Sequence, residues 1–112
     1  MLERRSRAGA LLLLAVALAP ALAAAAGPPS AERQAALLYL LRQDCGSCHG
    51  MTLKGGLGPS LLPEALEGKD SEGLAEIILH GVRGTPMPPW DVELSPEEAR
   101  WLARELKSGI RP

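Results

Sequence analysis

The sequence predicts an all-α domain with three main helices joined by long loops. Three segments carry apolar residues at helical spacing, and no segment alternates apolar and polar residues as a half-buried strand does. Internal repeats are also absent from the sequence. Loops this long are uncommon in a small domain unless something packs against them. The pattern therefore indicates a helical fold with an additional packing element.

The first predicted helix covers residues 31–44, with Ser30 as its N-cap. Apolar residues at helical spacing give this helix one face for the core, and Cys45 continues that face. These residues are Ala35, Leu37, Leu38 and Leu41. Five glycines between Gly46 and Pro59 predict an irregular loop there, whose backbone approaches another group closely.

The second main helix is predicted over residues 70–81, after a single helical turn near residues 63–68. Asp70 or Ser71 is expected to cap its start, and Gly81 to end it. Its apolar face is expected to consist of Leu74, Ile77 and Ile78.

The last helix is predicted over residues 95–109 and has the clearest local signals. Ser95 at the N-cap, Pro96 at the first helical position and Glu98 three residues after the cap together predict a capping box. Gly109 is expected to end the helix. The predicted buried stripe is Ala99, Leu102, Ala103 and Leu106.

Residues 1–26 have the three-part pattern of a secretory signal peptide. Three arginines precede an uncharged apolar run at residues 8–19, and small residues follow Pro20. The run is about a dozen residues long, shorter than the ~20 that a membrane-spanning helix needs. We expect cleavage between residues 23 and 27, which leaves residues 27–112 as one domain in the periplasm. An uncleaved membrane anchor is the alternative.

The composition of the remaining domain narrows its possible partners. Removing residues 1–23 takes three arginines and one glutamate from totals of 12 basic and 13 acidic residues, so 9 basic and 12 acidic side chains remain. A formal charge of about −3 argues against nucleic acid, because phosphate binding requires basic surface. The chain has two tryptophans, one tyrosine and no phenylalanine. So small and aromatic-poor a domain needs another bulky apolar group in its core.

The two cysteines, Cys45 and Cys48, are followed at once by His49. A thioredoxin-type dithiol would need a βαβ context, and a structural zinc site would need four ligands. A disulfide would leave the histidine and the glycine loop unexplained. C-x-x-C-H in an exported chain is the attachment signature of a c-type haem. The sequence therefore predicts one haem c, covalently attached through Cys45 and Cys48, with His49 as an axial iron ligand.

The sixth iron ligand is predicted to be Met87, in the proline-rich loop of residues 82–93. The three prolines next to it restrict the unfolded chain and favour an ordered loop. Met51 follows His49 too closely to reach the opposite face of the macrocycle. His80 closes the second helix, where a solvated cationic side chain suits the helix dipole, and it is the alternative ligand. An iron with six ligands leaves no position for a substrate, so we expect an electron carrier and not an enzyme.

The order of these motifs resembles that of the small monohaem class I cytochromes c. "DCGSCHG", "GLGPSL", "GTPMPPW" and the final "WLARELK" follow the family's order and span about residues 34–106. The resemblance implies a class I cytochrome c fold, in which the first and last helices cross and long loops wrap the haem. It also implies that the Pro59 carbonyl accepts the Nδ1–H of His49 and that Leu61 packs on the haem. The last helix lacks the family's usual aromatic residue, for which Trp101 is expected to substitute.

More closely, "YLLRQDCGSCHGMTLKGGLGPSLLPEAL" with "GVRGTPMPPW" is similar to the NirC-type cytochromes of denitrifying bacteria. This resemblance implies a monomeric periplasmic carrier that serves the dihaem nitrite reductase, as electron donor or through proteins of haem d maturation. The alternatives are a donor to another periplasmic oxidoreductase, and a gas or redox sensor in which Met87 leaves the iron. No membrane contact is expected after signal cleavage.

Overall fold

The computed structural model describes residues 27–110, and the predicted signal peptide lies outside them. The described part of the chain contains no strand, which confirms the all-α prediction. No helix within it is long and apolar enough to span a membrane. In chain order the elements are α1 (Ala31–Leu40), the π-helix η1 (Leu41–Cys45), α2 (Gly46–His49), α3 (Pro63–Leu66), α4 (Ser71–His80) and α5 (Pro96–Ser108).

The first helical segment consists of α1, η1 and α2 in direct succession, so it extends to His49. Ser30 caps it as predicted, because its side chain accepts a hydrogen bond from the Arg33 amide at 3.2 Å. The prediction that the irregular loop starts at Gly46 was wrong. Gly46 has the helical angles φ −60° and ψ −28°, whereas Gly50 has φ 89°. Glycine adopts either conformation readily, so its presence alone does not place the end of a helix.

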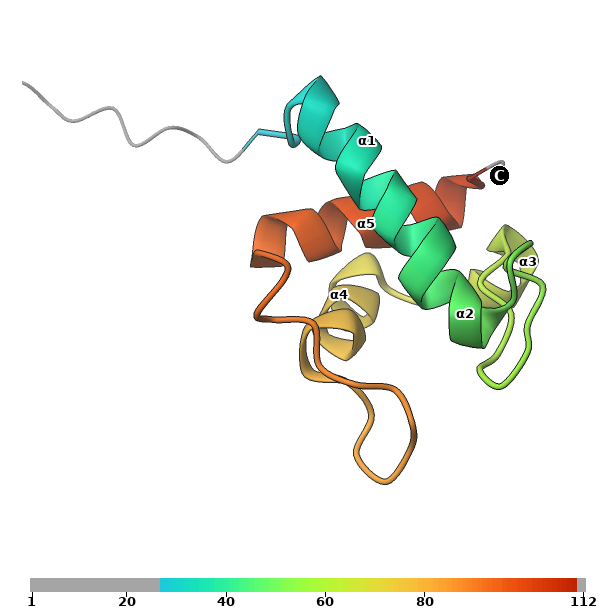
Figure 1. Ribbon diagram of the computed structural model, residues 1–112. Helices are drawn as coiled ribbons and strands as arrows, with labels where there is room; N and C mark the ends of the chain where they lie inside the picture. Colours follow the sequence, from blue (N-terminus) through green and yellow to red (C-terminus); the bar gives the residue numbers. More distant parts are fainter. Residues whose placement is uncertain (1–26, 111–112) are drawn as a thin grey trace, which may run out of the picture.

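The core lies along α5, which packs against α1, α3 and α4, and α1 crosses α5 in Figure 1. Leu37 is buried on α1, and Ala75 and Leu79 are buried on α4. For two residues the predicted position on the core-facing side of the helix was wrong. Ala35 is exposed, and Ile77 is 44% exposed. Each lies two positions from a buried residue of its own helix. Two positions correspond to about 200° of rotation, which directs the side chain away from the core.

The ends of α4 agree with the prediction. Asp70 is the N-cap, and its carboxylate accepts a hydrogen bond from the Gly73 amide at 3.1 Å. Gly81 ends the helix with φ 68°. The predicted face residues Leu74 and Ile78 are partly buried against the core.

The capping box at the start of α5 is present. Ser95 Oγ accepts a hydrogen bond from the Glu98 amide at 3.2 Å, and the Glu98 carboxylate accepts one from the Ser95 amide at 2.9 Å. Trp101 is buried in the core together with the predicted stripe. The stripe residues, all buried as predicted, are Ala99, Leu102, Ala103 and Leu106.

A salt bridge joins the beginnings of α1 and α5, across 65 positions of sequence. Arg33 Nε lies 2.5 Å from Glu98 Oε1, and Arg33 Nη2 lies 3.1 Å from Glu98 Oε2. The hydrogen bond from Arg33 is the main cause that lowers the pKa of Glu98 below its ordinary value. Because Glu98 also caps α5, one carboxylate both starts that helix and ties it to α1.

Candidate functional site

The two thiols are presented by one continuous helical segment. Cys45 ends η1, and Cys48 follows within α2. Both cysteines are half-buried and free. Burial, with a smaller effect of the Asp44 carboxylate, raises the pKa of Cys45 to about 11. A redox dithiol needs a thiol activated by a lowered pKa, so this environment does not favour such chemistry.

The described side chains do not form a protein-only metal site. Within residues 27–110, no three His, Cys, Asp or Glu side chains are grouped to hold a metal ion. His80 lies exposed at the end of α4, with its Nε2 3.2 Å from Glu76 Oε2. This matches the expectation of a solvated residue at the helix end.

His49 is oriented by a single backbone acceptor. Its Nδ1 lies 2.7 Å from the carbonyl oxygen of Pro59. A carbonyl oxygen only accepts hydrogen bonds, so Nδ1 must carry the proton. In the neutral ring the lone pair then resides on Nε2, the nitrogen available to a metal.

The loop after α2 packs its backbone directly against the attachment motif. The Gly58 amide donates to the Cys48 carbonyl, and the Gly55 amide donates to the His49 carbonyl, both at 2.8 Å. A Cβ on Gly58 would lie 2.7 Å from Cε1 of the imidazole, closer than real contacts of a Cβ. Glycine at position 58 therefore lets the loop approach the ring this closely, and a side chain there would force the ring or the loop to shift. The glycine-rich composition signalled this approach, but only the structure identifies the position.

Leu53 anchors the same loop in the core, and its importance was not apparent from the sequence. It is 3% exposed and has φ 62°, an uncommon conformation for a leucine. Its carbonyl accepts hydrogen bonds from the Leu61 amide at 2.9 Å and from Ser60 Oγ at 3.3 Å. Leu61 is partly buried against the core. No local pattern identifies a buried leucine with a positive φ, because tertiary packing stabilises it.

Met87 lies on a second loop, after α4, which the backbone closes on that helix. The Met87 carbonyl accepts a hydrogen bond from the Val82 amide at 3.2 Å, and the Met87 amide donates to Thr85 Oγ1 at 3.3 Å. The Trp90 amide donates to the Leu79 carbonyl at 3.0 Å. Both loops extend to the same side of the α1–α5 crossing in Figure 1. The loop that carries Met87 is therefore tied down by backbone hydrogen bonds at Val82, at Met87 and at Trp90.

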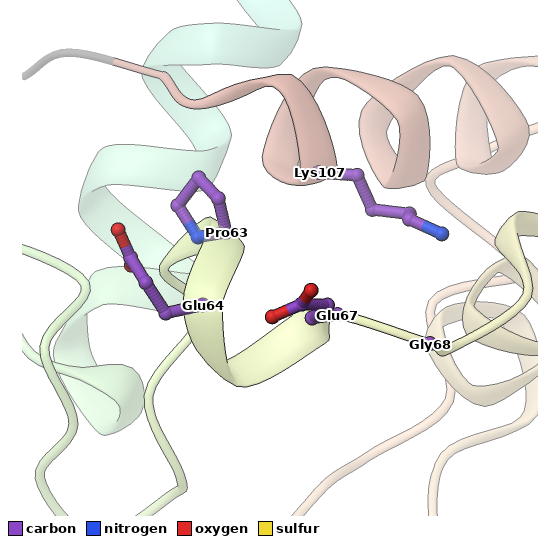
Figure 2. A pocket seen from close by; sticks show the side chains of 5 residues that line it. All are labelled: Pro63, Glu64, Glu67, Gly68 and Lys107. Carbon is purple, nitrogen blue, oxygen red and sulfur yellow. The ribbon is translucent and has the colours of Figure 1, made fainter.

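A pocket of about 450 Å³ lies away from these residues, between α3 and the end of α5. It is lined by Pro63, Glu64, Glu67, Gly68 and Lys107 (Figure 2). The ammonium group of Lys107 donates to the backbone carbonyl of Lys69. The lining contains no cysteine, histidine or methionine, so this pocket is not where the predicted site residues lie.

Known proteins are similar in sequence to most of this chain. A family model described as "Cytochrome C oxidase, cbb3-type, subunit III" matches residues 25–104. A cytochrome c55X of Pseudomonas aeruginosa is 57% identical over 81 residues, which cover 72% of this chain and 68% of the relative. A cytochrome c55X of Paracoccus denitrificans is 52% identical over 96 residues, covering 86% of this chain and 91% of the relative.

Solved structures show a similar fold. The c-type cytochrome NirC aligns with a TM-score of 0.73 and 56% identity, covering 75% of this chain and 100% of that one. The dihydro-heme d1 dehydrogenase NirN, in complex with DHE, aligns with a TM-score of 0.59 and 37% identity. That alignment covers 65% of this chain and 16% of NirN, so it concerns a small part of the larger protein.

Proposed function

The chain belongs to the cytochrome c family whose model matches residues 25–104, and from that premise we propose its function. We propose that the protein is a periplasmic one-electron carrier whose haem iron is held by His49 and Met87. Two predictions, the class I cytochrome c fold and the similarity to NirC-type cytochromes, are confirmed by the likenesses in sequence and structure. The cofactor is a covalently bound c-type haem, as predicted. When bound, the haem supplies a ferric–ferrous couple that takes up and releases one electron.

The residues around the motif fit such a group. Cys45 and Cys48 present two half-buried thiols from one helical segment, as attachment to two vinyl groups requires. Ile77 and Val82, near the end of α4, are 44% and 41% exposed, so the polypeptide leaves apolar surface uncovered there. A covalently held macrocycle would cover apolar surface and add the bulk that an aromatic-poor core lacks.

The single observation that carries the proposal is the 2.7 Å contact between His49 Nδ1 and the Pro59 carbonyl. It fixes the tautomer that offers Nε2 to the iron, and it limits rotation of the ring. A hydrogen bond from the other ring nitrogen also raises the basicity of a ligating histidine. The Pro59 carbonyl is therefore proposed as the group that orients and tunes the histidine ligand.

The order of the second loop supports a carrier more than a sensor. A sensor of the kind considered above needs Met87 to leave the iron readily. Both backbone groups of Met87 are hydrogen-bonded, the carbonyl to the Val82 amide and the amide to Thr85 Oγ1. A Cβ on Gly81 would lie 2.6 Å from the Met87 carbonyl oxygen, so the loop also packs closely on the end of α4. An ordered backbone lowers the entropy cost of keeping the Met87 thioether on the iron, which supports a six-coordinate carrier without catalytic activity.

We place the protein in the periplasm because of its predicted signal peptide, residues 1–26, and we expect a monomer. The proposed electron acceptor is the dihaem nitrite reductase implied by the resemblance to NirC-type cytochromes. Part of this chain is similar to a dihydro-heme d1 dehydrogenase, which supports a partner among proteins that use or mature haem d. A maturation protein of that pathway is therefore the alternative acceptor.

The test is to mix the reduced cytochrome with oxidised dihaem nitrite reductase and to follow haem oxidation by stopped flow, with and without nitrite. We expect oxidation with a rate constant that rises with reductase concentration and falls modestly with salt. No oxidation above the rate of the buffer control would exclude the donor role. A deletion strain that lacks only haem d content would instead favour maturation.

A matched pair of charge reversals locates the docking surface. Lys54 and Arg83 are exposed, one in each of the loops that follow α2 and α4. Lys54→Glu should change the rate and its salt dependence if partners dock at these loops, whereas Arg104→Glu, on the exposed side of α5, should have little effect. Equal effects of both reversals would indicate that net charge, and not a docking surface at the loops, controls the reaction.

A further inference from the structure

The helical turn that leads into the attachment motif and ends at Cys45 contains one residue more than a turn of α-helix would. In η1 the Gly46 amide donates to the Leu41 carbonyl, five positions earlier. In an unbroken α-helix that amide would donate to Arg42, four positions earlier. Such π-turns are rare, and they occur frequently at functional sites.

The buried side of this segment is defined by Leu37 and Leu41, which are 0% and 1% exposed. In an unbroken α-helix, successive side chains are rotated by about 100°. Cys48 would then lie about 20° to one side of Leu41, with Cys45 about 40° and His49 about 80° to the other side. The three groups would straddle the line of residues that packs into the core.

Because the π-turn takes up one extra residue, each residue of the motif lies where the preceding residue of an unbroken α-helix would lie. The motif is therefore rotated back by about 100° relative to Leu41. All three groups then lie on the same side of the Leu41 line, with His49 nearest to it and Cys48 farthest. Gly46 takes the place above Leu41, and it is buried while Cys45, Cys48 and His49 are half-buried. Cys45 is partly buried against the edge of the core cluster.

We propose that the π-turn η1 sets the rotation of the attachment motif, so that both thiols and the imidazole address the haem from one flank of the helix. The side of the helix that carries Leu37 and Leu41 can then pack into the core and against α5. Residues 41–44 act as positioning residues, because they determine the direction of Cys45, Cys48 and His49, the groups proposed to touch the cofactor. The inference rests on the haem attachment at Cys45 and Cys48 proposed above.

The first test is insertion of one alanine after Gln43, an exposed residue of η1, with Gln43→Ala as the control that keeps the length. The inserted residue advances the motif by about 100° relative to Leu41 and so rotates it across the Leu41 line. We expect loss of the doubly attached haem, measured by peptide mass and free-thiol content. The haemochrome band should move to longer wavelength where one vinyl group remains unattached. Gln43→Ala should keep both thioether bonds, and wild-type attachment in the insertion variant would overturn the proposal.

A second measurement needs no variant and holds even if the insertion variant does not fold. In the reduced holoprotein, scalar couplings across hydrogen bonds identify by NMR which carbonyl accepts from the Gly46 amide. Coupling to the Leu41 carbonyl is expected, and coupling to the Arg42 carbonyl would overturn the proposal. Failure of the attachment itself is distinguishable, because wild-type peptides would then carry no haem at Cys45 and Cys48.

Discussion

Replacement of Gly58 by alanine tests how closely the loop after α2 supports the histidine. An ideal Cβ at this position would lie 2.7 Å from Cε1 and 2.8 Å from Nδ1 of His49, whereas ordinary contacts begin at 3.4 Å. Gly58 is not among the residues with a positive φ, so the cost of the substitution is steric and not conformational. Relief of the contact requires a displacement of about 0.7 Å, the difference between 3.4 and 2.7 Å.

A ring displaced by that distance would lose its hydrogen bond to Pro59. A displacement along the hydrogen bond would lengthen the 2.7 Å contact to at most about 3.4 Å, beyond the usual range for N–H···O bonds. We expect Gly58→Ala to lower the free energy of unfolding by about 1–3 kcal/mol, the usual cost of overpacking and of a lost hydrogen bond. A less basic imidazole stabilises ferric iron less, so the reduction potential should rise. Loss of about 1.4 kcal/mol from the ferric state alone would raise it by ~60 mV, which is an upper bound.

The assays are denaturant unfolding of the ferric holoprotein and a potentiometric titration. Gly73→Ala is the matched control, because its nearest contact would be Asp70 Oδ2 at 3.9 Å and it lies within α4. We expect this control to stabilise the protein by about 0.5–1 kcal/mol, through helix propensity, without a change in potential. If Gly58→Ala matched wild type in both midpoint and potential, the close packing of the loop on His49 would be refuted.

Three further predictions concern Met87, the proposed second iron ligand, and the junction of α1 with α5. Met87→Ala should open the sixth coordination position, so that the ferrous protein binds carbon monoxide and the ferric protein loses its far-red thioether band. Retention of that band would make His80 the next ligand to test. Ser95→Ala should cost about 0.5–2 kcal/mol of stability in denaturant unfolding, with an unchanged haem spectrum, and an unaltered midpoint would contradict the role of the cap. Because Arg33 lowers the pKa of Glu98, the stability from their pair is fully present above the ordinary carboxyl pKa of 4.5 and is lost as the pH falls through the lowered pKa. Glu98→Gln should therefore be less stable than wild type at neutral pH and lose less stability in acid; parallel pH profiles would rule this out.

The sequence alone predicted the features that depend on a few neighbouring residues. The capping box of α5 needs only Ser95, Pro96 and Glu98 within one helical turn, and the buried stripe of that helix follows from its periodicity. The attachment motif likewise depends on the spacing of Cys45, Cys48 and a histidine, and the haem that it predicted is implied by the family to which the chain belongs. Such local patterns are readable because the groups that satisfy one another are close in the chain.

The tertiary structure decided the features that depend on distant segments. The Arg33–Glu98 pair spans 65 positions, and the exposure of Ala35 and Ile77 depends on which side of each helix meets the core. Leu53 accepts a positive φ because packing buries it, although local preference opposes that conformation. The glycines predicted an irregular loop that approaches another group closely, but the fold made Gly46 helical and placed Gly58 against an imidazole. Local chemistry thus predicted which residues form the site, whereas long-range packing determined the direction in which each of them points.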